Sequence, residues 1–122
     1  MITLKTLPQA TAQEVFDQIT QHLLKQGKAA RSGTGVCHYR IKLKGEVLKC
    51  AAGCLIANDE YNRMFEYLAW ESLVNDRKVP SAHCQLVCDL QKIHDREFPE
   101  DWPINFKVVA ARHDLKYNPQ PS

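Results

Sequence analysis

The chain lacks an apolar run of the ~20 residues that a membrane-spanning helix needs. Its first five residues also lack the charged and then apolar layout of a secretory signal. These absences argue against membrane insertion and against secretion. We therefore expect a cytoplasmic protein that makes no membrane contact.

Internal repeats, linkers and low-complexity segments are absent as well. Hydrophobic residues make up 44% and charged residues 25% of the 122 residues, which excludes disordered and collagen-like classes. A chain of this length buries about two-thirds of the surface that its unfolded form exposes, so it needs no disulfides or bound metal to be stable. We expect one globular domain over residues 1–122, with an extended arm at 1–10 and a frayed tail at 118–122.

Acidic residues are scarce in one part of the chain. Between positions 25 and 49 the only acid is Glu46, although the net charge of the whole chain is just +2. The same stretch holds seven basic residues: Lys25, Lys28, Arg31, Arg40, Lys42, Lys44 and Lys49. Such a segment suits phosphates or an acidic protein surface, and a solvated lysine-rich hairpin face is the plainer explanation.

Four segments carry the signals of helices. Thr11 with Glu14 matches a capping box, apolar residues then recur at helical spacing, and Gly27 ends the run. The same spacing predicts a second helix that begins after a cap at position 58 or 59 and breaks at residues 75–78. Pro80 opens a third helix, and Asp101 caps a fourth.

Alternating residues from Val36 onward predict a strand. Its apolar face would carry Cys37, Tyr39, Ile41 and Leu43, and its basic face His38, Arg40, Lys42 and Lys44. A turn at Gly45 and Glu46 would place Ile41 opposite Cys50 and Lys42 opposite Lys49. The predicted fold class is therefore α+β, with about four helices packed on a small antiparallel β-hairpin.

The five cysteines allow three kinds of chemistry. Four of them form pairs at i and i+4, Cys50 with Cys54 and Cys84 with Cys88. Their odd total and the reducing cytoplasm predict free thiols rather than disulfides. Burial in the core, metal binding and nucleophilic catalysis all stay open for them.

The enzyme hypothesis uses Cys50 or Cys54 as the nucleophile of a hydrolase or transferase, because both follow a predicted strand beside Lys49. His94 would act as the base, with Asp95 beside it; folding would have to bring His94, or His83, close to the thiol. Burial explains the same cysteines without any catalysis, because reduced cysteine is among the most buried residue types.

A structural zinc site is a further alternative, since both cysteine pairs have the C-x₃-C spacing and His83 adds a possible ligand. A domain with this much core does not need metal to fold, and the doublets at 94–95 and 113–114 lack further ligands. We expect neither a metal nor a cofactor.

The binding hypothesis uses the basic hairpin face, formed by His38, Arg40, Lys42, Lys44 and Lys49. Nucleic-acid readout would ordinarily add exposed aromatic residues, which this face lacks. We therefore expect a protein partner rather than nucleic acid, and the oligomeric state stays open.

Three stretches of the chain resemble a group of small proteins encoded by bacterial phages and prophages. They are residues 37–40 (CHYR), residues 49–61 (KCAAGCLIANDEY) and residues 90–95 (LQKIHD). The resemblance spans most of the chain and includes its opening residues 10–17. It implies an accessory protein that acts on host or rival-phage machinery, and it implies no particular activity or catalytic residue.

Overall fold

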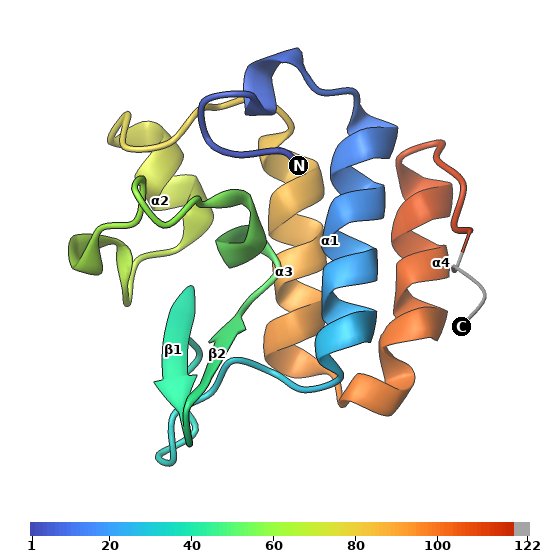
Figure 1. The fold of residues 1–122 in the computed structure, drawn as a ribbon. Helices are drawn as coiled ribbons and strands as arrows, with labels where there is room; N and C mark the ends of the chain where they lie inside the picture. The colour runs from blue at the N-terminus through green and yellow to red at the C-terminus, as the bar shows by residue number, and fades with distance from the viewer. Residues whose placement is uncertain (119–122) are drawn as a thin grey trace.

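Three long helices form one half of the molecule. In the computed structural model, which describes residues 1–118, α1 (Ala12–Gln26), α3 (Cys84–Arg96) and α4 (Trp102–Arg112) lie side by side (Figure 1). The short α2 (Trp70–Asn75) and the 3-10 helix at Ala52–Leu55 contact α3 from the other side. The hairpin of β1 (Arg40–Leu43) and β2 (Glu46–Lys49) contacts that 3-10 helix through β2. The predicted α+β class, four helices with an antiparallel hairpin, is confirmed.

The first helix follows its sequence signals closely. The Thr11 side chain accepts from the Glu14 amide at 3.1 Å, and the Glu14 carboxylate accepts from the Thr11 amide at 2.8 Å. Gly27 ends α1 at φ +71°, where its amide donates to Leu23. Both predicted boundaries of this helix are confirmed.

α3 is the scaffold of the fold, because it contacts α1, α2 and α4. Leu86, Val87, Leu90 and Ile93 are buried along it. Burial of each such side chain contributes roughly 1.5–3 kcal/mol. The largest fully buried residues around α3 are Trp70, Trp102, Phe16 and Phe106. Elements from both halves of the chain are therefore positioned by one helix.

The predicted second helix is wrong over most of its length. Residues 57–69 form turns and a 3-10 helix (Arg63–Phe65), and only α2 is helical. Tyr67 adopts φ +70°, which no α-helix accommodates. Phe65 is buried in the core, whereas the adjacent Met64, predicted to share its helix face, is 77% exposed. The apolar spacing thus reflects separate anchor residues and not one helix face.

The third and fourth helices begin close to their predicted starts. α3 starts at Cys84 rather than Pro80, because His83 before it has the left-handed φ of +59°. α4 follows Asp101 and has a proline in its first turn, as predicted, but the Asp101 side chain makes no capping hydrogen bond.

The N-terminal residues form a turn and a 3-10 helix (Leu7–Gln9) rather than the predicted extended arm. Leu7 is fully buried. The Glu60 carboxylate accepts hydrogen bonds from the amides of Leu4 and Lys5, at 2.9 and 3.0 Å. This carboxylate therefore ties the arm to the body of the molecule. The predicted frayed tail lies, apart from Asn118, outside the described residues.

The hairpin register differs from the predicted one. Lys44 and Gly45 form the turn at φ +51° and +79°, the two positive values of a type I′ turn, whose twist matches the strands. Ile41 therefore pairs with Leu48 and Arg40 with Lys49. The slip amounts to two residues, so every side chain keeps its predicted face. Cys50 still lies inside, with 1% of its surface exposed.

None of the helices described within residues 1–118 has the length and apolar character to cross a bilayer. All five cysteines are free, which confirms the prediction of reduced thiols.

Candidate functional site

A cavity of about 470 Å³ opens between α3 and residues 66–71, beside the entry to β1. Its walls carry carboxylates, basic groups, thiols and aromatic rings. The volume falls within the roughly 300–1,000 Å³ of small-molecule sites. Convergence of such mixed groups on one cavity marks it as the candidate functional site.

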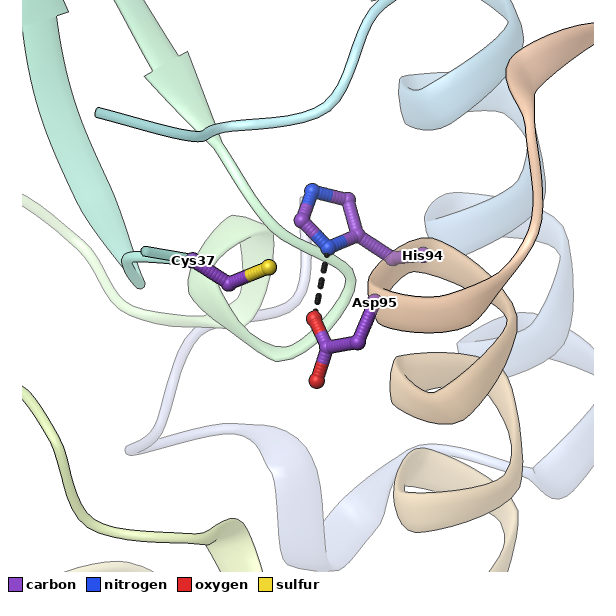
Figure 2. Close-up of side chains that lie close together, drawn as sticks. All are labelled: Cys37, His94 and Asp95. Atoms are coloured by element: carbon purple, nitrogen blue, oxygen red, sulfur yellow. Dashed lines mark hydrogen bonds and ion pairs between the residues drawn. The ribbon is translucent and has the colours of Figure 1, made fainter. Parts of the chain in front are cut away.

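Three side chains of chemical interest meet at the inner wall of this cavity. Cys37, His94 and Asp95 bring a sulfur, a ring nitrogen and a carboxylate oxygen within 4.8 Å of one another (Figure 2). His94 Nδ1 lies 2.8 Å from Asp95 Oδ1. On the opposite side of the ring, the amide of Ala30 donates to His94 Nε2 at 2.9 Å. The imidazole is fully buried between them.

The amide of Ala30 determines the state of His94. Because Nε2 accepts this hydrogen bond, it carries no proton, and the single ring proton of a neutral imidazole lies on Nδ1, pointing at Asp95. Both nitrogens are therefore occupied. A general base needs a free basic nitrogen, and a metal needs an unprotonated one facing it. The arrangement thus favours a structural role for His94.

The pKa values of the carboxyl and the thiol in the cluster are shifted in opposite directions. Burial alone would raise the pKa of Asp95, but hydrogen bonds from His94, Gln91 and Cys37 outweigh it and hold that pKa below its usual value. Burial, together with the Asp95 charge, raises the pKa of Cys37 to about 11. The cluster therefore pairs a carboxylate with a protonated thiol, and a thiol is a poor nucleophile.

The predicted nucleophiles lie in similar surroundings. Burial raises the pKa of the Cys50 thiol well above its ordinary value, and that of Cys54 to about 12. The half-buried Cys54 points its thiol at the carbonyl of Ala51. Neither cysteine lies in an electropositive pocket of the kind that activates thiols.

The cysteines predicted as an alternative zinc site do not converge. Cys84 Sγ lies 3.9 Å from Cys88 Sγ on α3, where burial raises the pKa of Cys88 to about 12. Within residues 1–118, the cluster of Cys37, His94 and Asp95 is the only group of three or more such side chains close enough for a shared metal. The structure therefore offers no four-ligand zinc site among these residues.

Glu66 holds the outer wall of the cavity in place. With only 9% of its side chain exposed, it accepts from the amides of Tyr39 at 2.9 Å and Arg40 at 3.3 Å, and from the Tyr61 hydroxyl. His38 Nδ1 lies 3.6 Å from the same carboxylate. Glu66 thus fastens residues 66–71 to the start of β1.

The predicted binding residues differ in how far they are exposed. His38 is half-buried against Glu66, and the Arg40 guanidinium lies 5.3 Å from the ring centre of Tyr61. Lys49 is half-buried, and Gln26 hydrogen-bonds both its amide and its carbonyl. The exposed members of the set are Lys42 and Lys44, at the end of the hairpin.

Sequence reasoning missed Cys37, Glu66 and Trp70 as site residues. No local motif marks them, because Cys37 meets Asp95 only through the tertiary fold. Cys50 and Asp95 both line the cavity, whereas His94 lies behind its wall.

Comparisons of the chain with protein-family models, with curated proteins and with solved structures found no match.

Proposed function

We propose that the chain is a binding protein that recognises an acidic protein surface through the end of its β-hairpin. The observation that carries this proposal is the state of Lys42 and Lys44. Both are exposed, and within residues 1–118 neither has a carboxylate within 4.0 Å. Unpaired cations on a projecting hairpin suit a partner of opposite charge.

The surroundings of these lysines support a protein partner. Val47 lies directly opposite Lys42 on the outer face and is 45% exposed, so the face offers apolar contact as well as charge. Arg40 and Lys49 are also paired on that face, where like charges repel unless an anion lies nearby. The resemblance to phage and prophage proteins favours a host or phage protein in the cytoplasm as the partner.

The enzyme alternative receives less support. Cys37, Cys50, Cys54 and Cys88 all have raised pKa values, and His94 has no free nitrogen. At pH 7 a thiol with a pKa of about 11 is ionised in about one molecule in ten thousand. We expect all four to react slowly with Ellman's reagent in the native protein and quickly in urea. One thiol that reacts as fast in the native state would revive the enzyme hypothesis.

The test of the binding proposal is a charge reversal at the hairpin end. Lys42→Glu/Lys44→Glu should weaken binding to immobilised poly-L-glutamate at least tenfold. The matched control is Lys107→Glu/Lys116→Glu, which makes the same charge change at exposed positions on and after α4, across the molecule from the hairpin (Figure 1). Equal loss in both variants would show mere net charge and contradict the proposal.

Two further arms address the partner class. Wild type and control should retain the same protein from a host lysate, and the hairpin variant should lose it. At 150 mM salt the wild-type protein should bind duplex DNA more weakly than it binds poly-L-glutamate. Tighter binding to DNA would replace the acidic protein with a phosphate backbone as the partner.

A further inference from the structure

The cavity described above has an aromatic wall with one strained member. Tyr67 adopts φ +70°, a conformation that a bulky side chain rarely takes. The residue is 80% exposed at the rim of the cavity, and its ring lies edge-on to His38 at a centroid distance of 5.9 Å. Strained residues of this kind concentrate at ligand clamps. The strained backbone at Tyr67 therefore lowers the stability of the fold while it holds an aromatic ring in solvent beside the cavity.

Deeper in the same wall lie Tyr39 and Trp70. Their ring centroids are 6.3 Å apart, and the Tyr39 hydroxyl is already bound by the carbonyl of Leu68. The indole nitrogen of Trp70 is buried and has no hydrogen-bond partner within residues 1–118. Tyr39, Tyr67 and Trp70 together line one side of the cavity with π surface.

The α3 side of the cavity presents two free cations. Lys92 and Arg96 both line it, are exposed, and have no carboxylate within 4.0 Å among residues 1–118. They stand at i and i+4, a spacing at which like charges destabilise a helix. A dianion between them would remove this repulsion, and arginine presents a planar fork that matches phosphate.

The remaining lining groups accept hydrogen bonds. Asp95 is ionised, and its two nitrogen donors, His94 and Gln91, both reach Oδ1, so Oδ2 receives neither of them. Glu71, beside Trp70, has no ion-pair partner in the described part of the chain. Glu66 is already satisfied by its own donors. A ligand with N–H groups on its ring would give Glu71 a partner and add a donor to those that Asp95 already has.

From this juxtaposition of an exposed, strained aromatic rim with two adjacent unpaired cations across one cavity, we infer that the cavity binds a nucleoside monophosphate. The base lies against Tyr67, and the phosphate lies between Lys92 and Arg96. An aromatic amino acid would supply a ring but only a single negative charge, so it fits the cation pair less well. The cavity is distinct from the hairpin end that the proposed function uses.

The two tryptophans make the site directly observable. In a ¹H–¹⁵N spectrum the chain gives two indole signals, since it contains Trp70 and Trp102. Trp102 donates to the carbonyl of Glu97 and does not line the cavity. Addition of 5′-AMP, GMP, CMP or UMP should shift the Trp70 signal and leave that of Trp102 in place. A Trp102→Phe variant assigns the two signals.

The ligand arms separate ring from phosphate. Adenosine and inorganic phosphate should each bind at least tenfold more weakly than 5′-AMP. A 5′-phosphorylated tetranucleotide that binds as tightly as 5′-AMP identifies a strand end as the natural source, and weaker binding identifies the free nucleotide. If none of the four mononucleotides moves the Trp70 signal at 5 mM, the inference is wrong.

The variants test each wall separately. Lys92→Gln/Arg96→Gln should weaken the binding of 5′-AMP at least tenfold and leave the binding of adenosine unchanged. The control Lys107→Gln/Lys116→Gln should leave the binding of both ligands unchanged. Tyr67→Gly should weaken both ligands at least fivefold without lowering the urea midpoint, because glycine relieves the positive φ. If Lys92→Gln/Arg96→Gln and Tyr67→Gly both bind 5′-AMP as tightly as the wild type does, the inference is wrong. Lys42→Glu/Lys44→Glu should not affect nucleotide binding, so this inference and the proposed function fail separately.

Discussion

The helical half of the molecule (α1, α3 and α4) and its irregular half (residues 28–79) are held together in different ways. The helices close their own hydrogen bonds and meet through buried apolar faces. The backbone of the irregular half is instead satisfied by single side chains from far away in sequence, as the Tyr39 amide is by Glu66 and the Lys49 amide is by Gln26 of α1. The candidate site lies where the second kind of construction meets α3.

This difference explains where unusual geometry is found. Among residues 1–118, three of the five non-glycine residues with positive φ lie in the irregular half, namely Lys44, Tyr67 and Arg77. The other two, His83 and Asp114, lie just outside the ends of helices. A helix would not accept such residues, whereas a loop fixed at several points can hold them. The site combines both kinds of structure, because Tyr67 comes from the irregular half and Lys92, Asp95 and Arg96 come from α3.

The largest expected effect contrasts one glycine from each half. A Cβ built at Gly53 would lie 2.0 Å from the carbonyl oxygen of Tyr39, so Gly53→Ala should lower the free energy of unfolding by about 3 kcal/mol or more. Gly27→Ala meets no atom within 4 Å and should lose only about 1 kcal/mol through its positive φ. Urea unfolding measures both. Equal losses would remove the contrast.

The next prediction compares two glutamates that bind backbone amides. Glu66→Ala leaves the amides of Tyr39 and Arg40 without their acceptor in a nearly buried site and should lower the free energy of unfolding by about 2 kcal/mol. Glu14→Ala removes one exposed half of a capping box and should lower the free energy of unfolding by less than Glu66→Ala does. Faster hydrogen exchange at Tyr39 and Arg40, in Glu66→Ala alone, would confirm the cause.

The smallest expected effect is on the stability of the protein at acidic pH. Burial alone would raise the pKa of both Asp89 and Asp95, but hydrogen bonds, from His113 and Gln85 to Asp89 and from His94 and Gln91 to Asp95, lower it overall. A folded pKa below the unfolded value of about 3.9 gives stability that is present above that pH and lost as the pH falls through the folded pKa. Asp89→Asn or Asp95→Asn should therefore flatten the acid side of the stability profile.

Hydrogen exchange distinguishes the two carboxylates. Below pH 4, loss of the Asp89 bonds should first expose amides of α4, since His113 follows that helix, and loss of the Asp95 bonds should first expose residues 30–37. Simultaneous exchange in both regions would mean that the two halves unfold as one unit in acid.

Local signals allowed prediction of α1 and its ends, because a capping box and a left-handed glycine act within a few residues. The second helix was mispredicted because Tyr61 and Phe65 anchor separate turns at a spacing that imitates a helix face. The hairpin register was mispredicted because two registers that differ by two residues share the same faces, and only the turn distinguishes them.

Most of the candidate site was beyond sequence reasoning. His94 and Asp95 were predicted as site residues, but their neighbour Cys37 and the amide of Ala30 arrive from a distant loop that no periodicity describes. Glu66 looks like any surface glutamate until the backbone that it binds is known. The roles of such residues depend on tertiary contacts rather than on spacing.

The fixed imidazole of His94 has a consequence for detection. Asp95 faces the cavity, His94 touches Asp95 with one nitrogen, and the amide of Ala30 touches the other, so a continuous line of bonds leads from the cavity to the far side of the cavity wall. We expect a molecule that hydrogen-bonds the carboxylate to change the strength of the His94–Asp95 bond, and through the ring that of the bond from Ala30. The proton resonance of a single backbone amide, at a position the ligand never meets, thereby records whether the cavity is occupied.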